Sequence, residues 1–326
     1  MPTMAVSSLE SGKSVEATVL GSLSRSSPTG RDSVAPLDLV GLAPLLELSA
    51  GRPETVIGLL DGPIAMDHAD LATGSISEVP GGPHGGCAQT SSAACLHGTF
   101  TAGILSAKRD STAPAICPGC TLLVRPIFEE TVARNGAMPS ATPGELAQAI
   151  IECIEADVRV LNLSVAFAQP SSRGERELEE ALNQAVRRGV IVVAAAGNQG
   201  TLVSSAITRH SWVIPVAACD LQGRPTAQTS FGSSIGKRGL GAPGEGVTSL
   251  GTGGEPITLG GTSVAAPFVT GAVALLWSIF PRATAAEMKV ALTGAYGRRR
   301  SAIIPPLLNA WESYQVMEKA TPKGGV

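Results

Sequence analysis

The sequence predicts an α/β fold with a central, mostly parallel sheet covered by helices on both faces. Short apolar runs are typical of buried strands, and helical segments alternate with them along the chain. The expected strands are Val56–Leu60, Thr121–Pro126, Val158–Val165, Val190–Ala195 and Trp212–Ala217. The expected helices are His97–Ala107, Pro143–Glu155, Glu175–Arg188, Thr262–Phe280 and Thr284–Leu292.

Two of the helical patterns are especially clear. The segment Glu175–Arg188 has apolar residues on one face and charges on the other, which is typical of a helix packed on a core. The segment Val264–Phe280 is almost entirely apolar and is stopped by Pro281, which indicates a buried helix. At 17 residues it is shorter than the ~20 that a membrane span needs, so we expect no membrane association.

The composition is that of one globular domain without a nucleic-acid partner. The chain has 326 residues, 44% of them hydrophobic, which is enough for a large core. Its net charge of −3 gives no excess of basic residues for binding nucleic acid. Length alone would permit two domains, but the motifs below span nearly the whole chain. We expect one domain over residues 36–318, between a flexible Ser-rich segment at 1–35 and a flexible tail at 319–326.

Ser263 is a candidate nucleophile because it opens the long apolar helix. A helix N-terminus presents unpaired N–H groups and a positive dipole end, which would stabilise an oxyanion formed beside this serine. Pro267 lies in the first turn, where a missing N–H costs little. The alternative is that Thr262 or Ser263 merely caps a buried helix.

A serine nucleophile needs a base, and the base needs a carboxylate to hold its tautomer. Among four histidines, His97 opens a segment of small residues that predicts a tightly packed helix. Asp61 ends a short apolar strand, where sites of α/β proteins are usually built. Alternatively, Asp61 forms a turn and His97 caps a helix. The other histidines, His68, His84 and His210, are expected in surface turns and loops.

Asn198 is the fourth candidate catalytic residue. It ends a further buried strand, and its amide could donate a hydrogen bond to a developing oxyanion, an interaction that lowers a barrier by about 3 kcal/mol. The alternative is an ordinary loop residue. Four such features in this order favour the catalytic interpretation.

These motifs resemble the subtilisin-like serine proteases, or subtilases. The resemblance rests on strand-Asp61-Gly62, His97-Gly98-Thr99, Ala196-Gly197-Asn198 and Gly261-Thr262-Ser263 through Pro267, and covers roughly residues 38–318. It implies a three-layer subtilisin-like fold and a serine peptidase without a cofactor or catalytic metal. By position, Asp61 would orient His97, His97 would act as general base and then acid, Ser263 would be the nucleophile and Asn198 the oxyanion donor.

Within the family, the sequence is most similar to the proteases that mature cyanobactin-type ribosomal peptides. The phrases that carry this similarity are Leu60–Pro63, Pro118–Cys120 and Ala242–Glu245. The implied substrate is a peptide or precursor peptide. We expect it to lie as an added strand beside Ser164, Val165, Ala166 and Phe167, with Ala195, Ala196 and Gly197 at the floor of the primary specificity pocket.

The chain departs from the family pattern at three places. Gly62 stands where most subtilases carry a hydroxyl residue after the aspartate. Bulky Phe167 stands where glycine is frequent, and Ser205-Ala206 replaces a usual Pro-Ala pair. Phe167 and the altered turn could reshape the substrate channel, so the sequence predicts no particular residue preference.

Four of the six cysteines, Cys87, Cys95, Cys117 and Cys120, lie in one short stretch. Free thiols are the default in a reducing cytosol, while a pair of disulfides or a zinc site are the alternatives. The C-x7-C spacing is loose for zinc, so no metal is expected. Cys95 stands two residues before His97, so its alkylation is expected to slow turnover.

Three functions remain open at this point. The favoured one is an endopeptidase that cleaves a ribosomally made precursor. The second is a transpeptidase or macrocyclase, which would carry a lid near the site, yet only 35 residues separate Asp61 from His97. The third is a silent peptide-binding scaffold. Residues 1–35 have no basic start followed by a long apolar run, so no secretory signal is recognised and a cytoplasmic location is expected.

Overall fold

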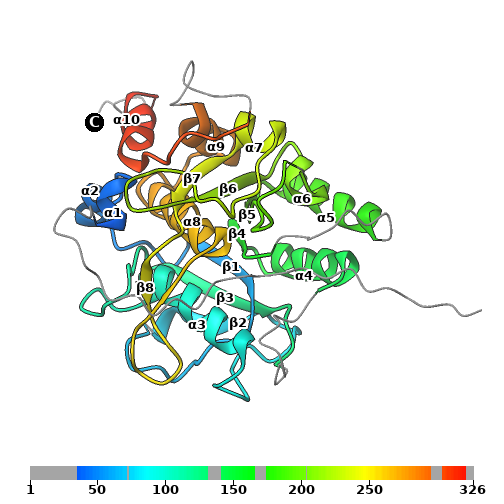
Figure 1. The fold of residues 1–326 in the computed structure, drawn as a ribbon, viewed down its shortest axis with the longest axis vertical. Coiled ribbons are helices and arrows are strands. Elements are labelled where there is room, and N and C mark those ends of the chain that lie inside the picture. The colour runs from blue at the N-terminus through cyan, green and yellow to red at the C-terminus, as the bar shows by residue number, and fades with distance from the viewer. Residues whose placement is uncertain are drawn as a thin grey trace, which may run out of the picture.

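A seven-stranded parallel sheet forms the centre of the protein in the computed structural model, which describes residues 35–71, 73–130, 141–165, 174–202, 204–294 and 303–320 (Figure 1). The strand order is β2-β3-β1-β4-β5-β6-β7. The strands are β1 (Val56–Asp61), β2 (Ile76–Glu78), β3 (Thr121–Pro126), β4 (Val160–Leu163), β5 (Ile191–Ala195), β6 (Ile214–Cys219) and β7 (Leu240–Pro243). The predicted α/β class is confirmed.

Helices cover both faces of this sheet (Figure 1). On one face, α3 (Ala93–Ser106) packs on β1, and α8 (Thr262–Ile279) packs on α3 and on β4 to β7. On the other face, α4 (Pro143–Glu155) packs on β1 and β3, and α5 (Glu175–Arg188) packs on α4 and β5. The apolar core accordingly divides into two clusters of buried residues, one under each helical layer.

The remaining elements are short and surround the sheet. They are α1 (Pro36–Leu39), α2 (Ala43–Leu48), η1 (Thr73–Ser75), α6 (Ala206–Arg209), α7 (Ser233–Arg238), the antiparallel pair β8 (Val247–Ser249) and β9 (Ile257–Leu259), α9 (Ala285–Gly294) and α10 (Ala310–Ala320). The first helix begins at the predicted domain boundary, and α10 runs two residues into the predicted tail. The predicted segment 1–35 lies outside the described residues except for Ala35.

Local signals explain where the layer helices begin and end. Thr142 and Glu145 form a capping box before α4, and α5 ends at Gly189 in the left-handed conformation, with φ 67°. Thr121–Pro126, Pro143–Glu155 and Glu175–Arg188 match their predicted bounds. By length and composition α8 could span a membrane, but 94% of it is buried inside the structure, as expected of a core helix.

Two predicted boundaries were wrong in a way that affects the site. Helix α3 begins at Ala93, four residues before His97, because Ser92 caps it and its hydroxyl accepts the Cys95 N–H at 3.1 Å. His97 therefore lies in the second turn of the helix. Strand β4 ends at Leu163, so Ser164 and Val165 already belong to the loop that follows it.

The strand order determines where the site forms. Strands β3 and β2 lie on one side of β1, and strands β4 to β7 lie on the other side. The direction in which successive strands are added to the sheet therefore reverses between β1 and β4. Crevices outside the carboxyl ends of strands at such a switch point are the usual sites of open α/β sheets. Asp61 is the last residue of β1 and stands at this point.

Candidate active site

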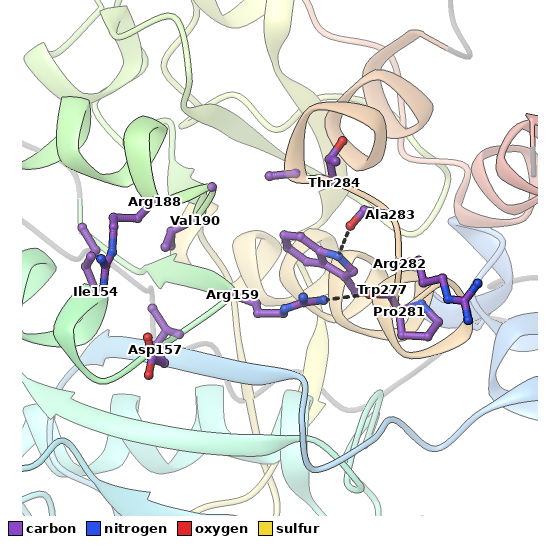
Figure 2. Close-up of a pocket in the computed structure, with 13 residues that line it drawn as sticks. Ile154, Asp157, Arg159, Arg188, Val190, Trp277, Pro281, Arg282, Ala283 and Thr284 are labelled. Atoms are coloured by element: carbon purple, nitrogen blue, oxygen red, sulfur yellow. Dashed lines mark hydrogen bonds between the residues drawn. The ribbon is translucent and has the colours of Figure 1, made fainter.

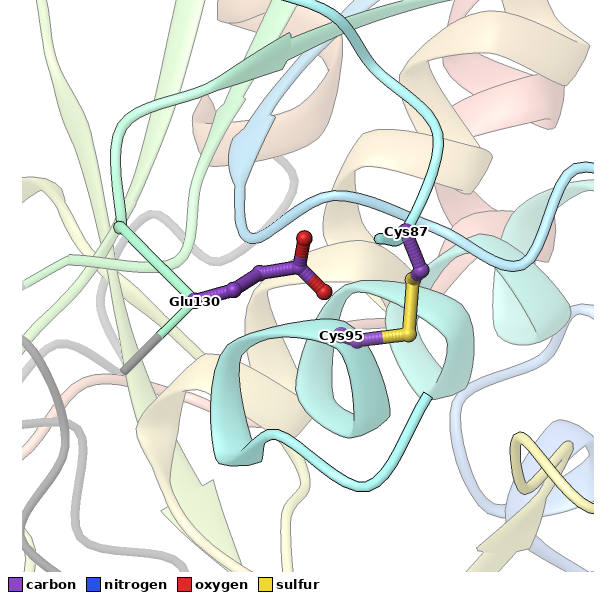
Figure 3. Close-up of side chains that lie close together, drawn as sticks. All are labelled: Cys87, Cys95 and Glu130. Carbon is purple, nitrogen blue, oxygen red and sulfur yellow. A yellow bond between two sulfur atoms is a disulfide. The ribbon is translucent and has the colours of Figure 1, made fainter. Parts of the chain in front are cut away.

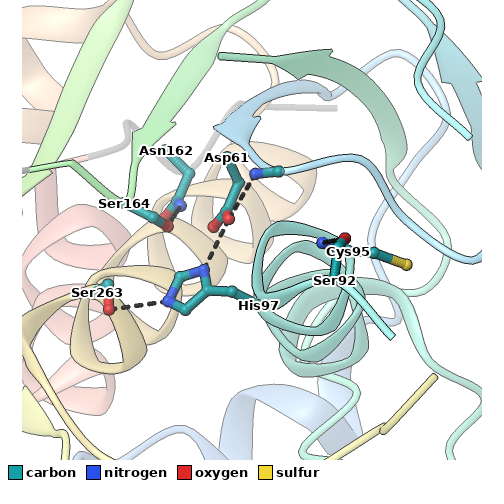
Figure 4. Close-up of polar contacts among 8 residues, drawn as sticks. Asp61, Ser92, Cys95, His97, Asn162, Ser164 and Ser263 are labelled. Carbon is teal, nitrogen blue, oxygen red and sulfur yellow. Dashed lines mark hydrogen bonds and ion pairs between the residues drawn. The ribbon is translucent and has the colours of Figure 1, made fainter. Parts of the chain in front are cut away.

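Asp61, His97 and Ser263 meet in one hydrogen-bonded line (Figure 4). His97 Nδ1 lies 2.6 Å from Asp61 Oδ1, and His97 Nε2 lies 3.0 Å from Ser263 Oγ. The three side chains come from β1, α3 and α8 and are 0%, 4% and 1% exposed. Because a carboxylate only accepts, Nδ1 carries the proton and Nε2 is left to accept the serine hydroxyl. This arrangement suits a base-activated nucleophile.

Asp61 is held by the backbone that follows it. The Gly62 N–H donates to Asp61 Oδ1 at 2.7 Å, so this oxygen accepts two hydrogen bonds. The second oxygen, Oδ2, is buried and has no hydrogen-bond partner among the described residues.

The departure at Gly62 has a steric cause. A Cβ on Gly62 would lie 2.0 Å from the carbonyl oxygen of Ala94 in α3. From the other side, a Cβ on Gly98 would lie 2.4 Å from the Pro63 carbonyl oxygen. The two glycines therefore allow α3 to approach the end of β1 closely, and a hydroxyl residue after Asp61 does not fit.

Ser263 occupies the first turn of α8 and does not cap it. The N-cap is Gly261, whose φ of 134° favours glycine and which has no side chain to make a capping hydrogen bond. The alternative that Thr262 or Ser263 is a cap is therefore wrong. The first turn directs its N–H groups and its dipole toward the region beside Ser263.

Asn198 is tied to the residue before the nucleophile. Its Oδ1 accepts from the Thr262 N–H at 2.8 Å and from the Thr262 hydroxyl at 3.0 Å. The Gly197 N–H donates in turn to the Thr262 hydroxyl at 3.1 Å. The side chain of Asn198 is thereby fixed in orientation by Thr262, and it also carries an amide NH2, which is a donor group.

The predicted substrate-binding residues are placed only in part. Ser164 and Val165 are buried directly after β4, whereas Ala166 and Phe167 lie outside the described residues. Ala195 ends β5, and Ala196 and Gly197 lead from it to Asn198. The Ala196 N–H donates to the Val216 carbonyl at 2.9 Å, which anchors this segment on β6.

A disulfide joins Cys87 to Cys95, two residues before His97 (Figure 3). The zinc alternative for these two cysteines and their expectation as free thiols are therefore wrong, because both sulfurs are used in the bond. Glu130 approaches them but accepts hydrogen bonds from the Ala88 and Gln89 N–H groups at 2.7 and 2.8 Å. The carboxylate thus holds the loop before α3.

The disulfide lies between the chain segments that carry Asp61 and His97. Cys87 N–H donates to the Ile64 carbonyl at 3.0 Å, and Ile64 N–H donates to the Gly85 carbonyl at 2.9 Å. The loop that ends at Cys87 is thereby attached to the segment after Asp61, while Cys95 belongs to α3. The expectation that alkylation of Cys95 slows turnover applies only after reduction.

Cys117 and Cys120 form no second disulfide and are buried thiols. The pKa of Cys117 is raised well above its usual range, mainly by a hydrogen bond with Cys120 and in addition by burial. The same hydrogen bond lowers the pKa of Cys120. Cys120 Sγ also lies 3.7 Å from the Ser278 hydroxyl of α8. This pair therefore packs under the helix that carries Ser263.

Among the other histidines, the expected surface position of His68 was wrong. His68 is 8% exposed and accepts the Asp70 N–H on Nδ1 at 3.1 Å. The His84 side chain is 77% exposed and pairs with Glu78, and His210 contacts Asn183. Each is engaged within its own local contacts rather than with the Asp61–His97–Ser263 line.

A cavity of about 550 Å³ lies at the opposite end of the sheet (Figure 2). Its wall includes Arg159 beside the start of β4 and Trp277 near the end of α8, with the guanidinium 4.9 Å from the indole centroid. Trp277 follows Ser263 by 14 residues of one helix, or about 21 Å. This cavity is therefore separate from the Asp61–His97–Ser263 site.

Fold and site together define the class of subtilisin-like serine proteases. Residues 52–302 match the subtilase family of peptidases, and the chain belongs to that family. The resemblance inferred from the sequence motifs is thereby confirmed.

Curated relatives are bacterial proteases. The chain is 33% identical over 189 residues to a thermostable alkaline protease of Halalkalibacterium halodurans, covering 58% of this chain and 48% of that protein. It is 32% identical over 222 residues to subtilisin Savinase of Lederbergia lenta, covering 68% and 75%. The match thus spans about half the length of the first relative.

Solved structures of peptide-maturation enzymes have the same fold. A variant of the protease domain of PatA superposes with a TM-score of 0.75 at 25% identity, covering 83% of this chain and 98% of that chain. The prenylagaramide maturation protease PagA has a TM-score of 0.72 at 24% identity, covering 85% and 98%. The PatG macrocyclase with bound peptide has a TM-score of 0.74 at 19% identity, covering 87% and 98%.

Replacing Gly62 by serine should impair both folding and catalysis. The new Cβ meets the Ala94 carbonyl, so α3 must move, and such overpacking destabilises by about 1–3 kcal/mol. Because α3 carries His97, activity should fall by roughly 100-fold. Gly74→Ala is the control, since a Cβ there meets nothing within 4 Å. Equal activity of Gly62→Ser and wild type would contradict the steric explanation.

Removing the disulfide should lower thermal stability. The cysteines are eight residues apart, and closing such a loop contributes about 2–3 kcal/mol in the chain-entropy view. The double variant Cys87→Ser/Cys95→Ser should melt roughly 4–8 °C lower than the oxidised wild type. Reductant should lower the melting temperature of the wild type toward that of the variant, and it should leave the melting temperature of the variant unchanged. A wild type that does not respond to complete reduction would show that the bond adds no stability.

Proposed function

We propose that the protein is a serine endopeptidase that hydrolyses peptide bonds through a Ser263 acyl-enzyme. The observation that carries this proposal is the unbroken line from Asp61 through His97 to Ser263, with hydrogen bonds of 2.6 and 3.0 Å. Membership of the subtilase family supports it. Occupation of all catalytic positions argues against a silent scaffold.

The chemistry follows from the positions of the protons. His97 Nε2 accepts the Ser263 hydroxyl proton as Oγ attacks the scissile carbonyl, and Asp61 stabilises the imidazolium that forms. The Asn198 amide and the first turn of α8 would bind the oxyanion. His97 then protonates the leaving amine. Water attacks the ester with His97 as base, and the Ser263–acyl bond breaks to regenerate the hydroxyl.

Two segments are proposed to bind substrate. The peptide would add as a strand along Ser164–Phe167, and its side chain next to the scissile bond would enter the space floored by Ala195–Gly197. Small residues at this floor would admit a large side chain.

A ribosomally made precursor peptide is the proposed substrate. The fold and 25% identity shared with the protease domain of PatA, a patellamide maturation protease, support this assignment. A cytoplasmic location, where precursors are made, is proposed with it. Alkylation of free thiols in intact cells would test this location. Free Cys87 and Cys95 would support the cytosol, and a disulfide between them would indicate an oxidising compartment.

A macrocyclase is the second candidate because PatG shares the fold. Such an enzyme must keep water from the acyl-enzyme until an amine attacks. Between β1 and α3, where all residues but 72 are described, the elements are η1, β2 and the isolated bridge of Ile64 with Gly86. This short connection favours hydrolysis.

Fluorophosphonate labelling tests the nucleophile. We expect one adduct, on Ser263 by peptide mapping, and none on Ser263→Ala. Peptidase activity of that variant should fall by about 10⁶-fold, the magnitude known for a related triad. A folded wild type that does not react would contradict the proposed mechanism.

The product of a precursor peptide separates the two candidate reactions. Hydrolysis should release a linear fragment that gains one water, measured by mass spectrometry, whereas transfer to an internal amine gives a cyclic product without it. Ser263→Ala is the control for contaminating proteases. A predominantly cyclic product would replace the hydrolase by the macrocyclase.

A further inference from the structure

Ser164 stands beside the carboxylate of the triad. Strands β1 and β4 are parallel partners, with Leu60 opposite Leu163, and the Ser164 N–H donates to the Leu60 carbonyl at 3.4 Å. The next pair in this register is therefore Asp61 and Ser164. Side chains alternate along a strand, so both lie on the face covered by α3 and α8. Figure 4 shows the two side chains in the same region.

Asp61 has an oxygen that lacks a donor. Oδ1 accepts from His97 and from the Gly62 N–H, whereas Oδ2 is buried without a hydrogen-bond partner among the described residues. A buried charged acceptor left unpaired is costly, and native structures rarely retain one. In the family, a hydroxyl residue usually follows the aspartate, but Gly62 has none.

Ser164 has a hydroxyl proton to offer. Its Oγ accepts from Asn162 Nδ2 at 2.8 Å, and Asn162 Oδ1 accepts from the Thr270 hydroxyl of α8 at 2.9 Å. All three side chains are at most 1% exposed. Because the amide of Asn162 donates to Ser164, the serine proton is directed away from Asn162 and needs another acceptor.

We propose that Ser164 is a positioning residue that donates its hydroxyl proton toward Asp61 Oδ2 through one bridging water. This inference rests on the proposed function of the Asp61–His97–Ser263 line. The donor fixes the rotation of the carboxylate and stabilises its charge while the imidazolium forms. Asn162 of β4, which is itself held by Thr270 of α8, orients Ser164. The hydroxyl after the neighbouring strand thus replaces the one missing at Gly62.

A matched pair of variants isolates the hydroxyl. Ser164→Thr keeps the donor, and Ser164→Val has nearly the same shape without it. With a peptide ester, we expect Val to lower kcat on the order of 10-fold or more and Thr to retain most of it. KM should stay unchanged in both, because the substrate strand would pair with the main chain of Ser164. Ser164→Ala is the second hydroxyl-free variant if Val does not fold.

The outcomes separate this inference from the proposed function. Wild-type protein is first tested for fluorophosphonate labelling at Ser263; failure there overturns the peptidase and the positioning role together. If the wild type labels but Thr and Val, or Thr and Ala, lose equal kcat, only the positioning role is overturned. A loss confined to KM overturns it as well. Melting temperatures of all variants exclude unfolding as the cause.

Discussion

The close approach of α3 to the end of β1 is the contact on which the site depends. Asp61 and His97 belong to different elements, and their hydrogen bond of 2.6 Å depends on how closely these elements approach. Gly62 and Gly98 permit this, since a Cβ at either would meet a carbonyl oxygen of the other segment. Close packing at these two positions thus sets the orientation of the imidazole, and the disulfide and Glu130 hold the loop that leads into α3.

The third catalytic position depends on a different constraint. Helix α8 is apolar on nearly all sides and is covered by the sheet and by α2, α3 and α9, and this burial determines where its N-terminus lies. Thr262 then links the start of α8 to Asn198 at the end of β5. The nucleophile and the proposed oxyanion donor are therefore positioned by one threonine, and their geometry is coupled to the sheet rather than to a flexible loop.

Much of this could be predicted from the sequence because periodicity and motif order are local. The apolar runs and the amphipathic helix at Glu175–Arg188 indicate the layers of the fold. The residue types at positions 61, 97 and 263 indicate the hydrogen-bonded Asp61–His97–Ser263 site. The start of α3 was missed because small residues before His97 have no strong helix pattern, and Ser92 was not recognised as its cap. Strands β2 and β7 have only three and four residues, too few for a period to be detected.

Features that depend on packing between distant segments could not be predicted. Nothing local indicates that Gly62 faces the Ala94 carbonyl, so its departure from the family pattern was observed but not explained. Pairing of Cys87 with Cys95 depends on how the loop folds back on the segment after Asp61. The Asp61–Ser164 neighbourhood requires the parallel register of two strands that are about a hundred residues apart in the chain. That register connects the two consequences of Gly62: the glycine lets α3 approach and also removes a donor from Asp61, and the residue after the adjacent strand carries the hydroxyl that can replace it.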